Sequence, residues 1–122
     1  MEKYIDVMKQ SVELSETTLE GLQHIQKLLT EGKFEETMSM FEDIVSAFST
    51  MQQSLTPVTE KLENHQIEST SNKVQDALEL VVSAYEAKSH GKVQEIIQFT
   101  LTPQMKKWKE ELEEAFQTYI VS

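Results

Sequence analysis

The chain has 122 residues, with 21 acidic residues against 11 lysines, no arginine and a formal net charge of −10. A chain of this length is expected to form one domain, residues 1–122, that buries its own core. Its negative charge repels nucleic acids and anionic membrane surfaces, and it lacks the guanidinium groups that recognise phosphates and base edges. We therefore expect neither nucleic acid nor a membrane as a partner.

Cysteine is absent, which excludes disulfides, thiolate nucleophiles and cysteine-based zinc sites. The first residues carry charge in every turn, unlike a signal peptide, and no stretch approaches the ~20 apolar residues of a membrane helix. These features favour a cytoplasmic protein. Only three glycines and two prolines occur among many Glu, Lys, Gln, Leu and Met residues, a composition that predicts an all-α fold.

The first predicted helix runs from about Lys3 to Leu29. Gly21 lies inside it at a cost of about 1 kcal/mol relative to alanine, and either permits close approach of another helix or marks a bend. Gly32 is expected to end the helix as its left-handed residue. The apolar stripe steps by threes, fours and sevens through Ile5, Met8, Val12, Leu19, Leu22 and Leu29.

The second predicted helix begins at Lys33 or Phe34 and is the most apolar long helix of the chain. Two apolar rows indicate burial against more than one neighbour, so we expect this helix to be the central one. The helical spacing of the apolar residues continues past Pro57, which predicts a helix axis that continues to about Asn64. The proline itself predicts a kink or a restart of the helix there. The rows are Phe34, Met38, Phe41, Val45, Phe48 and Leu55, and Ile44, Met51 and Val58.

Residues 64–72 are polar and rich in cap-forming residues, and they are the best candidate for the longest loop. A third helix is predicted from about Ser71 to Ser89. His90-Gly91 is expected to end it, with Lys92 opening the fourth helix. The main face of the third helix consists of Val74, Leu78, Val81 and Tyr85, while Leu80, Val82 and Ala84 indicate contact with a second neighbour.

The apolar stripe of the fourth helix continues through a second Thr-Pro step at Pro103, so this segment is one kinked helix or two nearly collinear ones. Four helical segments with short connections predict an all-α, antiparallel up-down-up-down four-helix bundle, with helices 2 and 4 kinked or restarted at Pro57 and Pro103. The stripe consists of Val93, Ile97, Leu101, Met105, Trp108, Leu112, Phe116 and Tyr119.

Two short patterns occur in both halves of the chain. Gly32-Lys33 is matched by Gly91-Lys92, and the Leu-Thr-Pro that ends at Pro57 is matched by the one that ends at Pro103. The separation between glycine and proline differs strongly between the halves, which favours coincidence over duplication.

Three histidines, His24, His65 and His90, are the first candidates for chemistry. None belongs to a Glu-x-x-His motif, and the expected topology places His24 and His90 near one end of the bundle and His65 near the other, so we expect surface histidines rather than metal ligands. His24-x-x-Lys27 resembles the His-x-x-Lys core of histidine phosphotransfer domains, with Leu28 where that family has a glycine. A phosphotransfer or metal-binding bundle that uses His24 or His90 is therefore the alternative function.

The only basic cluster, residues 106–109, surrounds the only tryptophan. On a helix Trp108 falls on the apolar stripe, whereas the lysines fall outside it and have glutamates four residues later. The pattern predicts a core tryptophan beside a solvated charged face, not a nucleic-acid surface.

The methionines suit either a soft core or an adaptable binding surface. Met38, Met51 and Met105 lie on apolar stripes and are expected in the core, and Met40 is expected to be exposed. No motif places a nucleophile beside a base, and no glycine-rich phosphate loop occurs. We therefore predict no catalytic, cofactor-binding or metal-binding residues and no enzyme activity.

The pattern Leu28-Leu29-x-x-Gly32-Lys33, followed by Phe41-Glu42-Asp43-Ile44 and by Pro103 with Trp108, resembles small acidic helical-bundle proteins of low-GC, Bacillus-like Gram-positive bacteria. In size, acidity and helicity the chain is also similar to flagellar and secretion export chaperones. These resemblances imply a bundle. We hypothesise a non-enzymatic module that binds another protein, or a further copy of itself, as an adaptor, regulator or chaperone.

Overall fold

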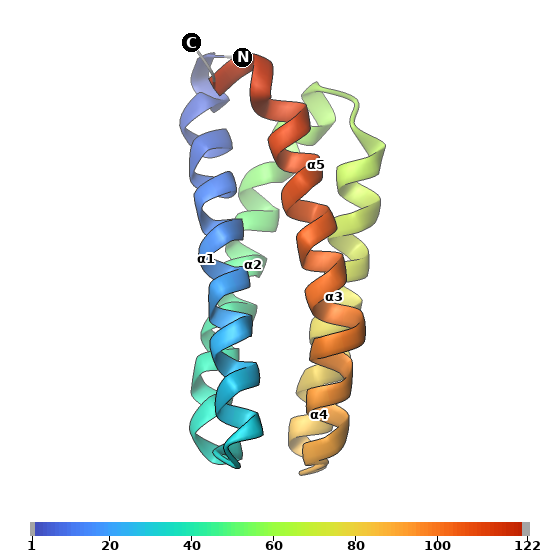
Figure 1. Ribbon diagram of the computed structural model, residues 1–122. Coiled ribbons are helices and arrows are strands. Elements are labelled where there is room, and N and C mark those ends of the chain that lie inside the picture. Colours follow the sequence, from blue (N-terminus) through green and yellow to red (C-terminus); the bar gives the residue numbers. More distant parts are fainter. Residues whose placement is uncertain (1, 121–122) are drawn as a thin grey trace.

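Four helical rods alternate in direction, as predicted for an all-α up-down-up-down bundle (Figure 1). This computed structural model describes residues 2–120, and no strand occurs in that range. The rods are α1 (Ile5–Thr30, preceded by a 3₁₀ turn at Glu2–Tyr4), α2 (Phe34–Lys61), α3 (His65–Glu86), and a fourth built from α4 (His90–Ile96), a π-helical segment (Ile97–Leu101) and α5 (Thr102–Ile120).

All three connections between the rods are tight turns of the same form. At the first turn, the Gly32 amide donates to the Leu29 carbonyl and the Lys33 amide donates to the Leu28 carbonyl, while Gly32 has φ +80°. This is a Schellman motif, which satisfies the last carbonyls of the helix. The prediction of Gly32 as the left-handed residue is confirmed.

The other two turns use residues that are not glycine. Glu63 (φ 52°) and Lys88 (φ 56°) occupy the left-handed position, and the following Asn64 and Ser89 amides donate back to Thr59 and Ala84. A left-handed conformation is costly for such residues, so the paired hydrogen bonds and the packing of the adjoining helices stabilise it.

The loop predicted at residues 64–72 is wrong, because α3 begins at His65 and only Leu62–Asn64 connect it to α2. The Asn64 side chain caps the helix by accepting a 3.0 Å hydrogen bond from the Ile67 amide. The serine and threonine side chains that resembled loop residues include Thr70 and Ser71, which are buried against the neighbouring helices.

The prediction that His90-Gly91 ends the third helix is also wrong. The helix ends at Glu86, Lys88 makes the turn, and Gly91 lies inside α4, where a β-carbon added to the glycine would meet nothing within 4 Å. Gly91 is therefore not the structural counterpart of Gly32, and the resemblance between the two halves does not extend to this pair.

The two Leu-Thr-Pro steps lie in different backbone structures. The helix α2 is continuous from Phe34 to Lys61 and does not restart at Pro57. Before Pro103, however, the backbone widens into the π segment, where the Thr102 amide donates to the Ile97 carbonyl five residues back. The π turn changes the hydrogen-bond register just before a residue that has no N–H to donate. A kink at either proline stays a prediction.

The rods form a ring in which α1 packs along α2 and α5, and α3 packs along α2 and the fourth rod. Phe41, Phe48 and Trp108 are almost fully buried, and the rings of Phe48 and Trp108 meet edge to face at 5.0 Å between centroids. The helix α2 is one member of this ring rather than a central element. Gly21 permits close approach, since an added β-carbon would lie 3.3 Å from Ile44 Cδ1 on α2.

The bundle has two distinct ends (Figure 1). The turns at Gly32 and Lys88 lie together at one end, which we call the Gly32 end. The turn at Asn64 lies at the other, the Asn64 end, beside the beginning of α1 and the end of α5. Among the described helices, none is sufficiently long and apolar to cross a membrane.

Candidate functional groove between α2 and α3

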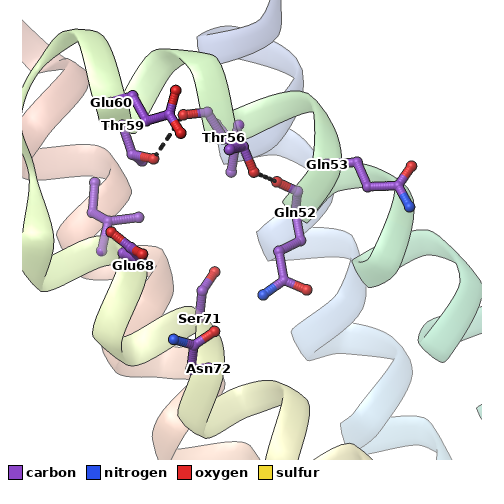
Figure 2. A pocket seen from close by; sticks show the side chains of 10 residues that line it. Gln52, Gln53, Thr56, Thr59, Glu60, Glu68, Ser71 and Asn72 are labelled. Carbon is purple, nitrogen blue, oxygen red and sulfur yellow. Dashed lines mark hydrogen bonds between the residues drawn. The ribbon is translucent and has the colours of Figure 1, made fainter.

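A groove of about 280 Å³ lies between the second half of α2 and the first half of α3, towards the Asn64 end. Its apolar floor is formed by Leu55 and Ile67, which are 2% and 1% exposed. Polar side chains form the rest of the lining (Figure 2): Gln52, Gln53, Thr56, Thr59, Glu60, Glu68, Ser71 and Asn72.

Two of the hydroxyl groups in the lining are already engaged by their own helix. Thr56 Oγ1 donates to the Gln52 carbonyl at 3.0 Å, and Thr59 Oγ1 donates to the Thr56 carbonyl at 3.1 Å. Threonines that bond the preceding turn in this way present their methyl groups to the neighbouring helix. These two residues therefore shape one wall of the groove and offer few hydrogen bonds to a ligand.

Three other side chains keep their hydrogen-bonding capacity. The amide of Gln52 extends from α2 towards Ser71 and Asn72 on α3, whereas Gln53 points away (Figure 2). Within residues 2–120, none of the side chains of Gln52, Ser71 and Asn72 makes a hydrogen bond to another protein group. Ser71 as a residue is 6% exposed, and its hydroxyl faces the open space of the groove. A hydroxyl in this position can bond to water in the open groove or to a ligand that enters it.

The groove has negative charge and no compensating cation in its lining. Glu60 and Glu68 stand on its rim, and no lysine is among the ten residues that line it. His65 Nδ1 lies 3.9 Å from Glu68 Oε2, and the two groups form an ion pair only when the histidine is protonated. The lining therefore favours cationic over anionic ligands.

None of the three histidines lines this groove, although His65 lies beside Glu68 on its rim. His24, His65 and His90 are all exposed, and the His90 ring stacks on Phe34 with 3.7 Å between centroids. In the part of the chain that the structure describes, no group of three or more His, Asp or Glu residues is placed to hold a metal ion. The structure thus gives His90 a packing contact at the Gly32 end and leaves the roles proposed for His24 and His90 untested.

The lysine cluster on α5 surrounds a core tryptophan, as predicted. Trp108 is 1% exposed, and Lys106 and Lys107 point to solvent. Lys109 donates to Glu113 at 2.8 Å and lies 3.7 Å from Glu16 on α1. The hydrogen bond to Glu113 raises the pKa of Lys109, against a smaller opposing effect of burial. These lysines are paired or solvated helix-surface residues.

The methionine-rich stripe belongs mainly to the interior. Met51 and Met105 are buried as predicted, whereas Met38 is half-buried. Met40, expected to be exposed, is half-buried against the core. Leu80, which was expected to contact a second helix, is instead 54% exposed, and Phe99 in the π segment is 69% exposed. Single exposed apolar residues of this kind are common on protein surfaces.

A second set of unpaired polar atoms lies on one buried face of α5. Gln104 Oε1, Trp108 Nε1 and both carboxylate oxygens of Glu111 are buried without a hydrogen-bond partner in residues 2–120. Glu111 also borders a small hollow with Asn64 and Gln66 at the start of α3. These atoms are closed to solvent, in contrast to the open groove, so they bear on stability more than on binding.

Sequence reasoning missed the groove because it placed a loop over residues 64–72. The signal that would have corrected this is the spacing of Ile67, Ser71 and Val74, which continues the stripe of the third helix backwards in steps of four and three. An asparagine three residues before Ile67 completes a helix start. With α3 extended to His65, the polar residues fall opposite the second half of α2.

A family model described as a domain of unknown function (DUF8042) matches residues 6–111. The match includes α1, α2, α3, α4, the π segment and the first half of α5, and therefore both walls of the groove. No curated protein and no solved structure matches the chain.

Proposed function

The chain belongs to the DUF8042 family, and we propose that it is a non-enzymatic module that binds another protein, as an adaptor, a regulator or a chaperone-like factor. The observation that carries this proposal is the groove between α2 and α3. In this open groove, polar side chains without a protein partner among the described residues, such as Gln52 and Ser71, lie beside an apolar floor.

The physical argument rests on the contrast between the groove and the rest of the bundle. A helical bundle gains stability by closing its interior, so a groove left open between two helices lacks packing that larger apolar side chains would supply. A bound partner can supply this packing and replace the water that solvates the polar lining. Binding sites commonly depart from the pattern that maximises stability.

The surrounding charge agrees with a protein partner. With a net charge of −10, the chain attracts basic protein surfaces and repels nucleic acids. The resemblance to proteins of low-GC Gram-positive bacteria and the acidic composition support a bacterial, cytoplasmic setting as part of this proposal.

The proposal is tested by blocking the groove and comparing what co-purifies with the protein. Ser71→Leu places a larger apolar side chain in the groove, and Ser83→Leu makes the same change at an exposed position further along α3. We expect the protein that co-purifies with the unmodified chain in stoichiometric amounts to be retained by Ser83→Leu and lost from Ser71→Leu, as measured by quantitative mass spectrometry.

Folding must be checked separately, because Ser71 is buried. If circular dichroism shows that Ser71→Leu is unfolded, Asn72→Leu replaces it, since Asn72 is exposed and lines the same groove. Retention of the partner by a folded groove variant contradicts the proposal, as does the absence of any stoichiometric partner from the unmodified chain.

A further inference from the structure

We propose that the groove between α2 and α3 receives the side chain of an arginine in a basic segment of the partner protein. This inference rests on the proposed function and names the chemistry of its site. It depends on four properties of the groove: its volume, its floor, its hydrogen-bonding groups and its charge.

The volume of the groove suits a single side chain. Pockets for whole small molecules are usually about 300–1,000 Å³, and this groove has a volume of about 280 Å³. It is also short, since its α2 wall runs only from Gln52 to Glu60. A partner helix needs a longer apolar surface for its anchors at successive turns. One side chain inserted from a segment lying across the rim fits these dimensions.

The floor and walls match the two parts of an arginine. Leu55 and Ile67 form an apolar floor that can pack against methylene groups. The polar end of the side chain then meets Gln52 from α2 and Ser71 and Asn72 from α3. Each of these three side chains offers an oxygen that accepts hydrogen bonds. A planar guanidinium carries five N–H donors in a fork and can donate to both walls at once, which the compact ammonium of lysine does less well.

Ser71 is the most informative of the three acceptors. It is more than nine-tenths buried, lines the groove and has no protein partner in residues 2–120. Its hydroxyl can accept a hydrogen bond from a ligand that reaches the bottom of the groove. A cation held by the rim glutamates alone would not contact this hydroxyl.

The charge of the lining selects a cation. Glu60 and Glu68 stand on opposite walls, and none of the ten lining residues is basic. The net charge of −10 adds long-range attraction for a basic segment. Complementary charge increases the association rate and orients the encounter, while the hydrogen bonds inside the groove decide between arginine and other cations.

The experiment is a ¹⁵N NMR titration of the full chain with three peptides of equal length. Each is a glycine–serine peptide with three identical residues at fixed positions: arginine, lysine or citrulline, the last having the shape of arginine without its charge. We expect the arginine peptide to shift the side-chain amide signals of Gln52 and Asn72 and to bind at least about fivefold more tightly than the lysine peptide, because only the guanidinium fork matches both walls. The citrulline peptide is expected to bind at least about tenfold more weakly, since it lacks charge.

Matched variants separate the groove from general electrostatics. Glu60→Gln/Glu68→Gln and Glu35→Gln/Glu36→Gln change the net charge equally, but the second pair lies at the start of α2, at the Gly32 end. The groove pair should weaken binding of the arginine peptide at least about tenfold, and the distant pair by less than about twofold. Ser71→Ala should weaken it about threefold to tenfold, as for a lost hydrogen bond to a charged group.

Four outcomes overturn the inference: equal binding of the arginine and lysine peptides, signal shifts outside the groove, equal weakening by the two glutamine pairs, and free arginine or spermidine binding as tightly as the peptide. The last two indicate general attraction of cations or a small-molecule site.

Because the co-purification experiment uses no added peptide, its result is independent of the peptide titration. If Ser71→Leu loses the cellular partner while the arginine peptide fails to bind, the inference fails and the proposed function stands.

Discussion

The contact between α2 and α3 differs markedly at its two ends. Towards the Gly32 end it is closed by aromatic side chains, with Tyr85 packed against Phe34 and Phe41 at 5.1 and 5.5 Å between ring centroids. The Tyr85 hydroxyl and Thr37 Oγ1 lie 2.8 Å apart in a buried hydrogen bond. Towards the Asn64 end the same two helices enclose the open polar groove.

The difference shows how one pair of helices can combine stability with a binding surface. Large rings fill the space between the helices at one end, whereas Ser71, Thr56 and Thr59 are too small to fill it at the other. Side chains fill the whole space between the helices at the closed end, whereas at the open end the packing is limited to buried apolar residues such as Leu55 and Ile67. Substitutions should therefore affect stability mainly at the closed end and binding mainly at the open end.

The largest expected effect is that of Phe41→Ala at the closed end. Phe41 is 1% exposed, so the substitution should lower the free energy of unfolding by about 3–5 kcal/mol through lost burial and the cavity that remains. Chemical denaturation followed by circular dichroism measures this change. Gln52→Ala, in the groove, is the comparison and should change stability by less than about 0.5 kcal/mol. A loss below about 1 kcal/mol for Phe41→Ala would show that the aromatic cluster does not hold the helices together.

A gain of stability is expected from Glu111→Leu near the Asn64 end. Both carboxylate oxygens of Glu111 are buried without partners, and a leucine of similar size removes that cost. The free energy of unfolding should rise by about 1–3 kcal/mol. Glu114→Leu, one turn away at an exposed position, is the control and should stay within about 0.5 kcal/mol. If Glu111→Leu destabilises the protein, the carboxylate has a stabilising partner in solution.

The smallest effect, and the one with a distinctive pH dependence, is expected for Tyr85→Phe. Burial raises the pKa of Tyr85, and the hydrogen bond with Thr37 lowers it by less. The folded state therefore disfavours the ionised form of the Tyr85 side chain. The stability that the neutral side chain contributes is complete below the unfolded pKa of about 10, and it is lost as the pH rises through the higher pKa of the folded state.

Below pH 10, Tyr85→Phe should cost about 0.5–1.5 kcal/mol for the lost hydrogen bond. Above pH 10 the free energy of unfolding of the variant should fall less with rising pH than that of the unmodified protein. Urea denaturation at a series of pH values measures this difference. Tyr119→Phe, at a 38% exposed position, is the control. Parallel pH profiles for the unmodified protein and Tyr85→Phe would contradict this assignment.

The sequence by itself determined the helical class, the antiparallel order and most of the core. The periodic spacing of Phe34, Phe41 and Phe48 predicts their burial, and the same reasoning places Trp108 inside despite its lysine neighbours. Such patterns are reliable because a helix repeats every 3.6 residues wherever it lies, so each residue's face follows from the chain alone.

The tertiary structure decided the turns and the groove. Glu63 and Lys88 adopt left-handed conformations that their side chains do not favour, because the adjoining helices must reverse direction there. The polar residues around Ser71 form a helix because Asn64 caps it and α2 packs against it. Whether a polar residue meets solvent, a neighbour or an unfilled space depends on where the next helix lies, which local sequence does not specify.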